Sequence, residues 1–396
     1  MIKLILSLSF AISLLSAVTI DELAKSSFEK NNDIKSLETS VKVAQEQINV
    51  SKNWENPMLA FKVNNIGLNK PLSNQKEYGV ELSQVIPFGN RLEIEESIAL
   101  KDRNIKTFDL EDKKLELESK IYEYSYSIII LQKRYKLIES YLQNTAKLEE
   151  LYNSLYKYQK ATLGEILNTK VSSLDLKLEL DNLNTMIYNM YLNLKLITYQ
   201  DTQTIDESID VKELNKAQID RDIVLSHPKL KALEEDSLKF KDMATLEDSK
   251  KLSSVTLSVE YMQNNEQDYA NLTVGIPLPI YKTENINSLK AKLSTNETNN
   301  RLNSSIHSLD IQTDITLNSL NRSAKNYKLI QKEIIPLKQK IQQNLDSYNS
   351  FDMAKPQESI NNLNELITYE TKALDELQKY YESYSQLLYL TNKGLK

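Results

Sequence analysis

Cysteine is absent from the 396-residue chain, and glycine and proline are scarce, with six and eight residues. The lack of cysteine excludes disulfides, thiolate metal ligands, a cysteine nucleophile and a lipidated N-terminal cysteine. Few glycines and prolines leave long stretches without turn-forming residues, which favours long helices. The formal net charge of −6 disfavours binding to nucleic acid, because affinity for a phosphate backbone comes from excess Lys and Arg.

Residues for catalysis or metal binding are also scarce. The two histidines, His227 and His307, have no other ligand residues at metal-site spacing. His227 precedes Pro228 at an expected helix start, where a local structural role is favoured over ligation. The sequence contains no glycine-rich phosphate loop and no nucleophile motif. We therefore expect no catalytic, cofactor or metal site, and we expect that the chain is not an enzyme.

The first 17 residues have the order of a secretory signal peptide. Lys3 precedes an apolar run from Leu4 to Leu15, and the small residues Ser16 and Ala17 follow. The alternative is a first buried helix. A membrane span is excluded, because a run of about a dozen apolar residues is too short to cross a bilayer. We expect cleavage after Ala17 and export. No later segment has the ~20 uninterrupted apolar residues of a membrane helix.

Two stretches, 58–87 and 254–277, alternate between apolar and polar residues with a period of two. Each predicts a hairpin of two strands with one apolar and one polar face. In the first, Leu59, Phe61 and Val63 alternate with Lys62 and its neighbours. The sequence LSQVIP at 82–87 aligns with LTVGIP at 272–277, an offset of 190 residues. This repeat predicts two similar halves. The predicted division is a signal peptide at 1–17, a first repeat at 18–200, a connector at 201–226 and a second repeat at 227–396.

The rest of the chain predicts helices. Thr19 with Glu22 forms a capping-box pattern that opens a helix to about residue 52. Residues 90–163 contain no glycine and no proline, and one helix of that length would reach about 110 Å. Gly164 marks a turn before a helix at 165–198. Residues 280–335 are a second stretch without glycine or proline and predict another long helix, which Pro336 should kink or break. That helix resumes to about residue 352, and a last helix covers 358–390.

Four two-faced strands cannot close a barrel, and an open sheet has unpaired edges that lipid does not permit. Membrane barrels usually need at least eight strands, so several copies of the chain must combine. Three copies would give twelve strands. Each strand is expected to have about nine or ten residues, enough to cross a bilayer at a tilt. The alternative is a soluble sheet with one face packed on helices and one face in water.

Two groups of polar residues are candidates for a functional role. The polar strand faces would line a water-filled lumen, with the candidates Lys62, Glu81, Ser83, Thr256, Ser258 and Glu260. Carboxylates near two predicted helix ends would form rings that favour cations when repeated by symmetry, with the candidates Asp346, Asp352, Glu358 and Glu165. The alternative for the carboxylates is ordinary solvated charge on a helix surface.

Several motifs, in this order, resemble those of the TolC-like outer-membrane efflux proteins over essentially all of the mature chain. The matching segments are Asn32-Asp33-Ile34, Asn56-Pro57, GVELSQVIPFGNR (79–91), YKYQKATLGEILNT (156–169), His227-Pro228-Lys229-Leu230, Pro336 with the following Tyr348, and SYNSFDMAKPQESINNLNEL (347–366). The QVIPFGNR stretch is most similar to the CzcC/CusC-like branch, which serves heavy-metal exporters. Drugs and other exported substrates are the alternative cargo.

The resemblance implies a mainly α fold with a small β part. It implies a long α-helical coiled-coil barrel and four transmembrane β-strands per protomer, which complete a 12-stranded barrel as a homotrimer. The implied location is the outer membrane, in contact with its lipid and with a long periplasmic extension. The implied partners are a periplasmic adaptor (a membrane fusion protein) and an inner-membrane efflux pump, as in an RND system.

The function that follows is a passive duct in a tripartite efflux system. The rival functions are a periplasmic adaptor, another secreted coiled-coil interaction protein, and a cytoplasmic coiled-coil scaffold. An adaptor would carry one helical hairpin between split β domains, whereas this sequence has two repeats that each contain a hairpin flanked by helices.

Overall fold

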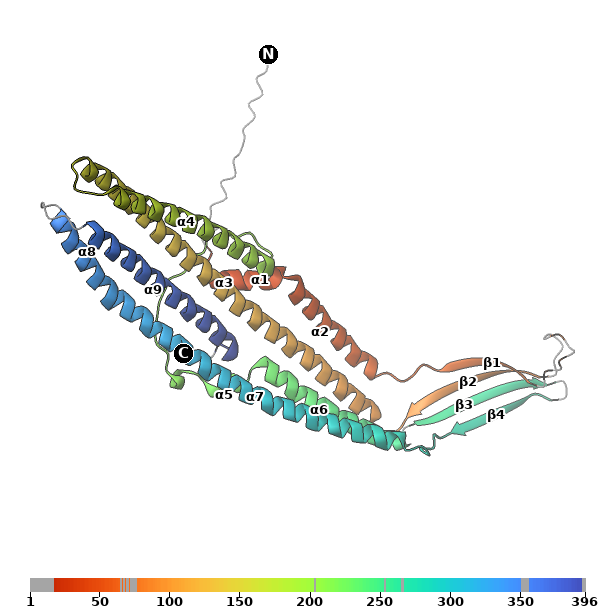
Figure 1. Ribbon diagram of the computed structural model, residues 1–396. Helices are drawn as coiled ribbons and strands as arrows, with labels where there is room; N and C mark the ends of the chain where they lie inside the picture. The colour runs from red at the N-terminus through yellow and green to blue at the C-terminus, as the bar shows by residue number, and fades with distance from the viewer. Residues whose placement is uncertain are drawn as a thin grey trace, which may run out of the picture. The chain divides into compact units, whose positions relative to one another are not determined.

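A computed structural model describes residues 18–64, 66, 68, 71, 77–202, 204–252, 254–264, 267–349 and 356–393 (Figure 1). The expected signal peptide at 1–17 lies outside these residues. The chain forms two compact units, each built from both predicted repeats. Of the described residues, the first unit contains those in 18–35, 113–225 and 309–393, and the second contains those in 36–112 and 226–308.

The fold is mainly helical with one small sheet, as the sequence predicts. The first repeat contains α1 (Ile20–Lys30), α2 (Asn32–Ser51), β1 (Met58–Asn64), β2 (Glu77–Pro87), α3 (Arg91–Lys157) and α4 (Leu163–Thr198). The connector contains the 3₁₀ turn η2 (Lys216–Gln218) and α5 (Arg221–Leu225). The second repeat contains α6 (Pro228–Ser249), the turn η3 (Lys250–Leu252), β3 (Ser254–Asn264), β4 (Tyr269–Gly275), α7 (Thr283–Leu329), the π-helix η4 (Ile330–Ile334), α8 (Ile335–Asn349) and α9 (Pro356–Leu390).

The helix α3 confirms the long uninterrupted helix predicted after the first hairpin. It has 67 residues, which corresponds to about 100 Å at 1.5 Å per residue. Gly89, with φ +66°, lies just before it and allows the chain to turn out of β2. The Arg91 guanidinium then forms an i,i+4 ion pair of 2.9 Å with Glu95 in the first turns.

The single helix predicted from Thr19 to about residue 52 is divided in the structure at Asn31. The capping box of Thr19 and Glu22 is present, but Asn31 has an extended backbone and ends α1. Its side-chain oxygen accepts hydrogen bonds from the backbone N–H of Asp33 at 2.8 Å and of Ile34 at 3.2 Å, which caps α2. Its side-chain amide donates to the Ile197 carbonyl at 2.8 Å. Asparagine favours caps over helix interiors, and this cap interrupts the helix.

The turn before α4 is made by residues other than the predicted Gly164. Gln159 adopts a left-handed backbone with φ +57°, and Thr162 caps α4 through a capping box with Glu165. Gly164 lies inside the first turn of α4. The turn therefore depends on a cap and on one strained non-glycine residue.

The regular α-helix is interrupted directly before Pro336, where the sequence predicts a kink or a break. The π-helical segment η4 comes directly before α8, whose second residue is Pro336. A proline ring clashes with the carbonyl four residues earlier in a regular α-helix. The wider π turn accommodates the ring, and the helical path continues from α7 into α8.

The four strands form one antiparallel sheet in the order β1-β2-β3-β4 (Figure 1). Both predicted hairpins are confirmed. The contact between them is new: β2 and β3 pair along their whole length, from Glu77 opposite Asn264 to Pro87 opposite Ser254. The two inner strands have 11 residues, but β1 and β4 have only seven, fewer than the predicted nine or ten. Pro57 and Pro277 flank the short strands, and neither residue can donate a ladder hydrogen bond.

The helical core of the first unit contains a half-buried carboxyl group. Tyr141 packs in a cluster with Ile330, Ile335 and Leu366, and its hydroxyl donates a 2.6 Å hydrogen bond to Glu370. Burial raises the pKa of Glu370 above its ordinary value, and the hydrogen bond from Tyr141 opposes that effect. Burial thus penalises the ionised form of this side chain in the folded state.

We predict that Glu370→Gln changes how stability depends on pH. A raised carboxyl pKa means that the unfolded chain releases its proton first, so the wild type loses stability as pH rises from about 4.3 through the folded-state pKa. The glutamine variant lacks this loss and should gain in melting temperature relative to wild type across that window. Thermal unfolding monitored by circular dichroism between pH 3.5 and 8 measures it.

Tyr141→Phe is the matched variant for this test. It removes the hydrogen bond that favours the carboxylate, so its loss of stability with rising pH should be larger than that of the wild type. A difference between Glu370→Gln and wild type that stays constant with pH would contradict the assignment.

Candidate functional site

The strand register places the six predicted lumen residues on one face of the sheet. Directly paired residues in an antiparallel sheet project to the same side, and successive residues in a strand project to opposite sides. The row Ala60–Glu81–Glu260–Asn271 crosses all four strands. Stepping by two from this row gives the predicted residues Lys62, Ser83, Thr256 and Ser258. We call this side the polar face.

Charged side chains on the polar face connect the two hairpins. The Lys62 ammonium on β1 forms ion pairs with Glu81 on β2 and with Glu260 on β3, the latter at 3.0 Å. Glu260 also accepts a 3.0 Å hydrogen bond from the Asn271 amide on β4. One network therefore spans the four strands. Such exposed pairs contribute little stability individually, but their geometry defines the polar face.

Three polar-face residues escaped the sequence analysis because their roles depend on register. Asn271 completes the charged row, and Glu77 accepts a 3.1 Å hydrogen bond from the Asn264 amide. Gly79 lies beneath the fully buried Met262 side chain. A β-carbon at Gly79 would lie 2.0 Å from the Met262 sulfur and 2.6 Å from the Tyr261 carbonyl oxygen. Only glycine fits at this position.

The opposite side of the sheet, the apolar face, is hydrophobic apart from Gln84 and Gln263, and many of its side chains are exposed. Phe61 is 81% exposed and Leu272 is 69% exposed. Its other exposed members are Leu59, Val80, Leu82, Val259, Tyr261 and Val274. A contiguous exposed apolar surface of this kind marks contact with lipid or with another protein.

The sheet has two open edges. β1 and β4 each pair with one neighbour, so their outer sides have no strand partner within the described sheet. An edge strand presents a row of unpaired N–H and C=O groups that can pair with another chain. Together, the two faces and two edges form the candidate site of this protein.

The structure places three of the four candidate carboxylates at helix ends. The fourth, Asp352, lies outside the described residues. Glu165 caps α4, and its carboxylate accepts a 2.6 Å hydrogen bond from the Thr162 N–H. Asp346 near the end of α8 accepts a 2.9 Å hydrogen bond from the Gln342 amide. Glu358 lies exposed in the first turn of α9. For Glu165, the capping bond alone explains the residue type.

His227 has the local role that its sequence context suggests. It is fully buried at the start of α6, and its Nδ1 accepts a 3.2 Å hydrogen bond from the Lys229 N–H. Nowhere in the described ranges do three or more His, Asp or Glu side chains gather as potential metal ligands. None of the helices in the described part of the chain has both the length and the apolar composition of a membrane span.

Long paired helices and two hairpins joined in one four-stranded antiparallel sheet define the TolC-like fold of outer-membrane channels, and this chain has that fold. CusC, studied for its transmembrane channel formation, is 12% identical with a TM-score of 0.81, over 95% of this chain and 92% of its own.

Two further solved structures give the same result. The CmeC outer membrane channel of Campylobacter jejuni is 12% identical with a TM-score of 0.79, over 95% of this chain and 86% of its own. The outer membrane protein VceC of Vibrio cholerae is 11% identical with a TM-score of 0.80, over 95% of this chain and 97% of its own. No protein-family model and no curated protein matches the chain by sequence. At these identities the comparison establishes the fold.

We predict that Gly79→Val destabilises the sheet by about 1–3 kcal/mol, because the added β-carbon overlaps the Met262 side chain and the Tyr261 backbone. Gly275→Ala is the matched control in the same sheet, since a β-carbon there meets its nearest atom, on Thr256, at 3.7 Å. Chemical unfolding of both variants measures the effect. Equal stability of the two variants would contradict the close packing of Met262 over Gly79.

Proposed function

We propose that the protein is the outer-membrane duct of a tripartite efflux system. In this role it conducts substrates passively after an inner-membrane pump expels them, and it is not an enzyme. The observation that carries the proposal is the four-stranded sheet with an exposed apolar face, a charged polar face and two open edges. That combination suits a segment of a barrel wall with lipid on one side and water on the other.

The open edges support a homotrimer. In lipid every backbone polar group needs a partner, so the outer edges of β1 and β4 must be paired. Pairing β4 of one copy with β1 of the next closes a ring, and three copies of the four strands give twelve. The two repeats, 18–200 and 227–396 with the connector at 201–226, would each supply one hairpin to this barrel.

The helices and the N-terminal segment support the location. An apolar N-terminal segment at 1–17 fits export, and the proposed location is the outer membrane with a long periplasmic extension. The partners that fit this architecture are a periplasmic adaptor and the inner-membrane pump. Likeness of fold to outer-membrane channels such as CmeC supports the assignment.

The charges of the polar face suit cations. Glu77, Glu81 and Glu260 supply three carboxylates against the single ammonium of Lys62. Acidic rings in a pore favour cations, and threefold symmetry would repeat this set around the lumen. Heavy-metal cations are therefore the proposed cargo. Asp346, Asp352, Glu358 and Glu165 would form a second acidic constriction at the helical tips.

We predict that Leu272→Lys prevents insertion and Thr273→Lys does not. The two residues are neighbours on β4 and project to opposite faces. A lysine on the lipid side costs about 2–4 kcal/mol near the bilayer midplane, whereas a lysine in the lumen meets water. Membrane fractionation and single-channel conductance of the purified variants in planar bilayers measure the difference.

The wild type and Thr273→Lys should both fractionate with the outer membrane and conduct. Equal behaviour of both variants would contradict the assignment of the faces. A wild-type protein recovered in the soluble periplasmic fraction would contradict the duct itself.

A further inference from the structure

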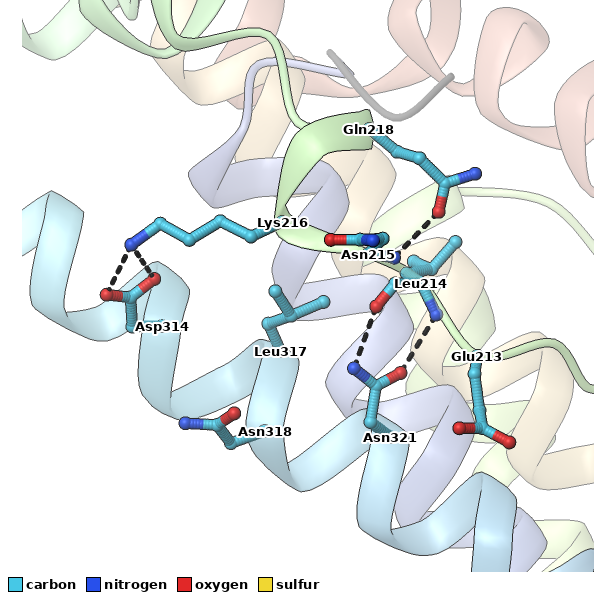
Figure 2. Close-up of a pocket in the computed structure, with 9 residues that line it drawn as sticks. All are labelled: Glu213, Leu214, Asn215, Lys216, Gln218, Asp314, Leu317, Asn318 and Asn321. Carbon is cyan, nitrogen blue, oxygen red and sulfur yellow. Dashed lines mark hydrogen bonds and ion pairs between the residues drawn. The ribbon is translucent and has the colours of Figure 1, made fainter.

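Side chains of the first unit hold the connector by one edge of its backbone. The Tyr381 hydroxyl accepts a 2.8 Å hydrogen bond from the Asp210 N–H and donates to the Asp210 carbonyl at 3.1 Å. Tyr380 holds both backbone groups of Lys212 in the same way, at 3.1 and 3.0 Å. The next such contact is on α7: the Asn321 amide both donates to and accepts from Leu214, each at 2.8 Å (Figure 2).

The same edge is also used further upstream. The Val18 N–H donates to the Thr204 carbonyl at 3.4 Å, and the Asp206 N–H donates to the Val18 carbonyl at 3.2 Å. All backbone contacts of this segment thus fall on even-numbered residues, with the period of two that defines an extended strand. The N–H and C=O groups of the odd-numbered residues, from Ile205 to Glu213, point to the other side. Within the described chain those groups have no hydrogen-bond partner.

The side chains of the connector follow the same alternation. Ile205, Ile209 and Val211 are half-buried, whereas Asp206 and Asp210 are exposed. The connector is therefore a two-faced strand: one face is apolar apart from Glu207, and the other carries Asp206 and Asp210 together with Lys212. Its free backbone edge lies between the two faces, open to a further strand.

The charge of this strand is mainly negative. Residues 205–213 contain four carboxylates and one lysine, Lys212, which forms an ion pair with Asp210 at 2.5 Å. Glu213 faces Lys328 at 3.4 Å. Edge strands are often protected from pairing by charge, commonly lysine. Opposite charges on paired strands stabilise the pairing and like charges destabilise it. An acidic strand edge therefore favours a basic partner strand over an acidic one.

We propose that the connector edge, residues 205–213, binds an extended basic segment of another polypeptide by strand addition. The bound segment alternates apolar residues, which lie beside Ile209 and Val211, with lysines or arginines, which lie beside Asp206 and Asp210. The main-chain bonds supply affinity and the alternating side chains supply specificity. Because Tyr380, Tyr381 and Asn321 already hold the strand extended, binding loses little conformational entropy.

The test uses the purified full-length chain in detergent and a fluorescently labelled eight-residue peptide that alternates Lys and Val. Fluorescence anisotropy should show saturable binding that weakens as salt concentration rises. A peptide that alternates Glu and Val should bind at least tenfold more weakly. Methylating the peptide backbone nitrogens on its pairing edge, with the protein unchanged, should cause a loss of similar size.

Val211→Pro is the protein variant for this test. It removes an N–H from the free edge, and proline favours an extended preceding residue, as Asp210 already is. We expect at least tenfold weaker peptide binding with little change in melting temperature, and Val211→Ala, which keeps the N–H, should bind like the wild type.

Equal binding of the two peptides to the wild type would overturn the proposal, and so would binding that backbone methylation of the peptide does not weaken. A third contradicting result is that the wild type binds no peptide and Val211→Pro loses self-assembly, which would show that a second copy covers the edge. The connector belongs to the first unit and the sheet to the second. The peptide result is thus separate from the insertion test of the duct.

Discussion

The need to pair every backbone hydrogen-bonding group in lipid is the constraint on which this account depends. The sheet satisfies it internally between β1 and β2, β2 and β3, and β3 and β4, but not at its two outer edges. A soluble protein can leave such edges to water. The exposed apolar face, with Phe61 and Leu272 as its most exposed members, is typical of a surface that contacts lipid or another protein. With the proposed location in lipid, the two open edges would have to pair with further copies of the chain.

The central pairing of β2 with β3 makes the two hairpins act as one wall segment. Lys62 on the first hairpin reaches Glu260 on the second, so the polar face crosses the junction without a break. The fit of Met262 over Gly79 lies at the same junction. In the connector, the hydrogen-bond partners of one backbone edge are side chains instead of a neighbouring strand. They belong to Tyr380, Tyr381 and Asn321. In both places an extended segment has one edge paired and one edge available.

Period-two alternation and the lack of glycine and proline were sufficient to predict the hairpins, their faces and the long helix α3. The sequence could not reveal the pairing of β2 with β3, because register between distant strands depends on tertiary contacts. The form of two local features was also beyond the sequence. Asn31 ends a helix through its side-chain cap, and Pro336 is accommodated by the π turn before it. Both outcomes depend on hydrogen bonds or helix geometry that residue type alone leaves open.

The most direct measurement is cross-linking between β1 and β4 in this cysteine-free chain. One cysteine is placed on β1 at a position from 59 to 63 and one on β4 at a position from 270 to 274, and the combinations are scanned in isolated outer membranes. Two intervening strands separate β1 from β4 within one chain by roughly 14 Å, too far for a disulfide. The account predicts covalent trimers in at least one register. Absence of cross-linked trimers in every register would contradict it.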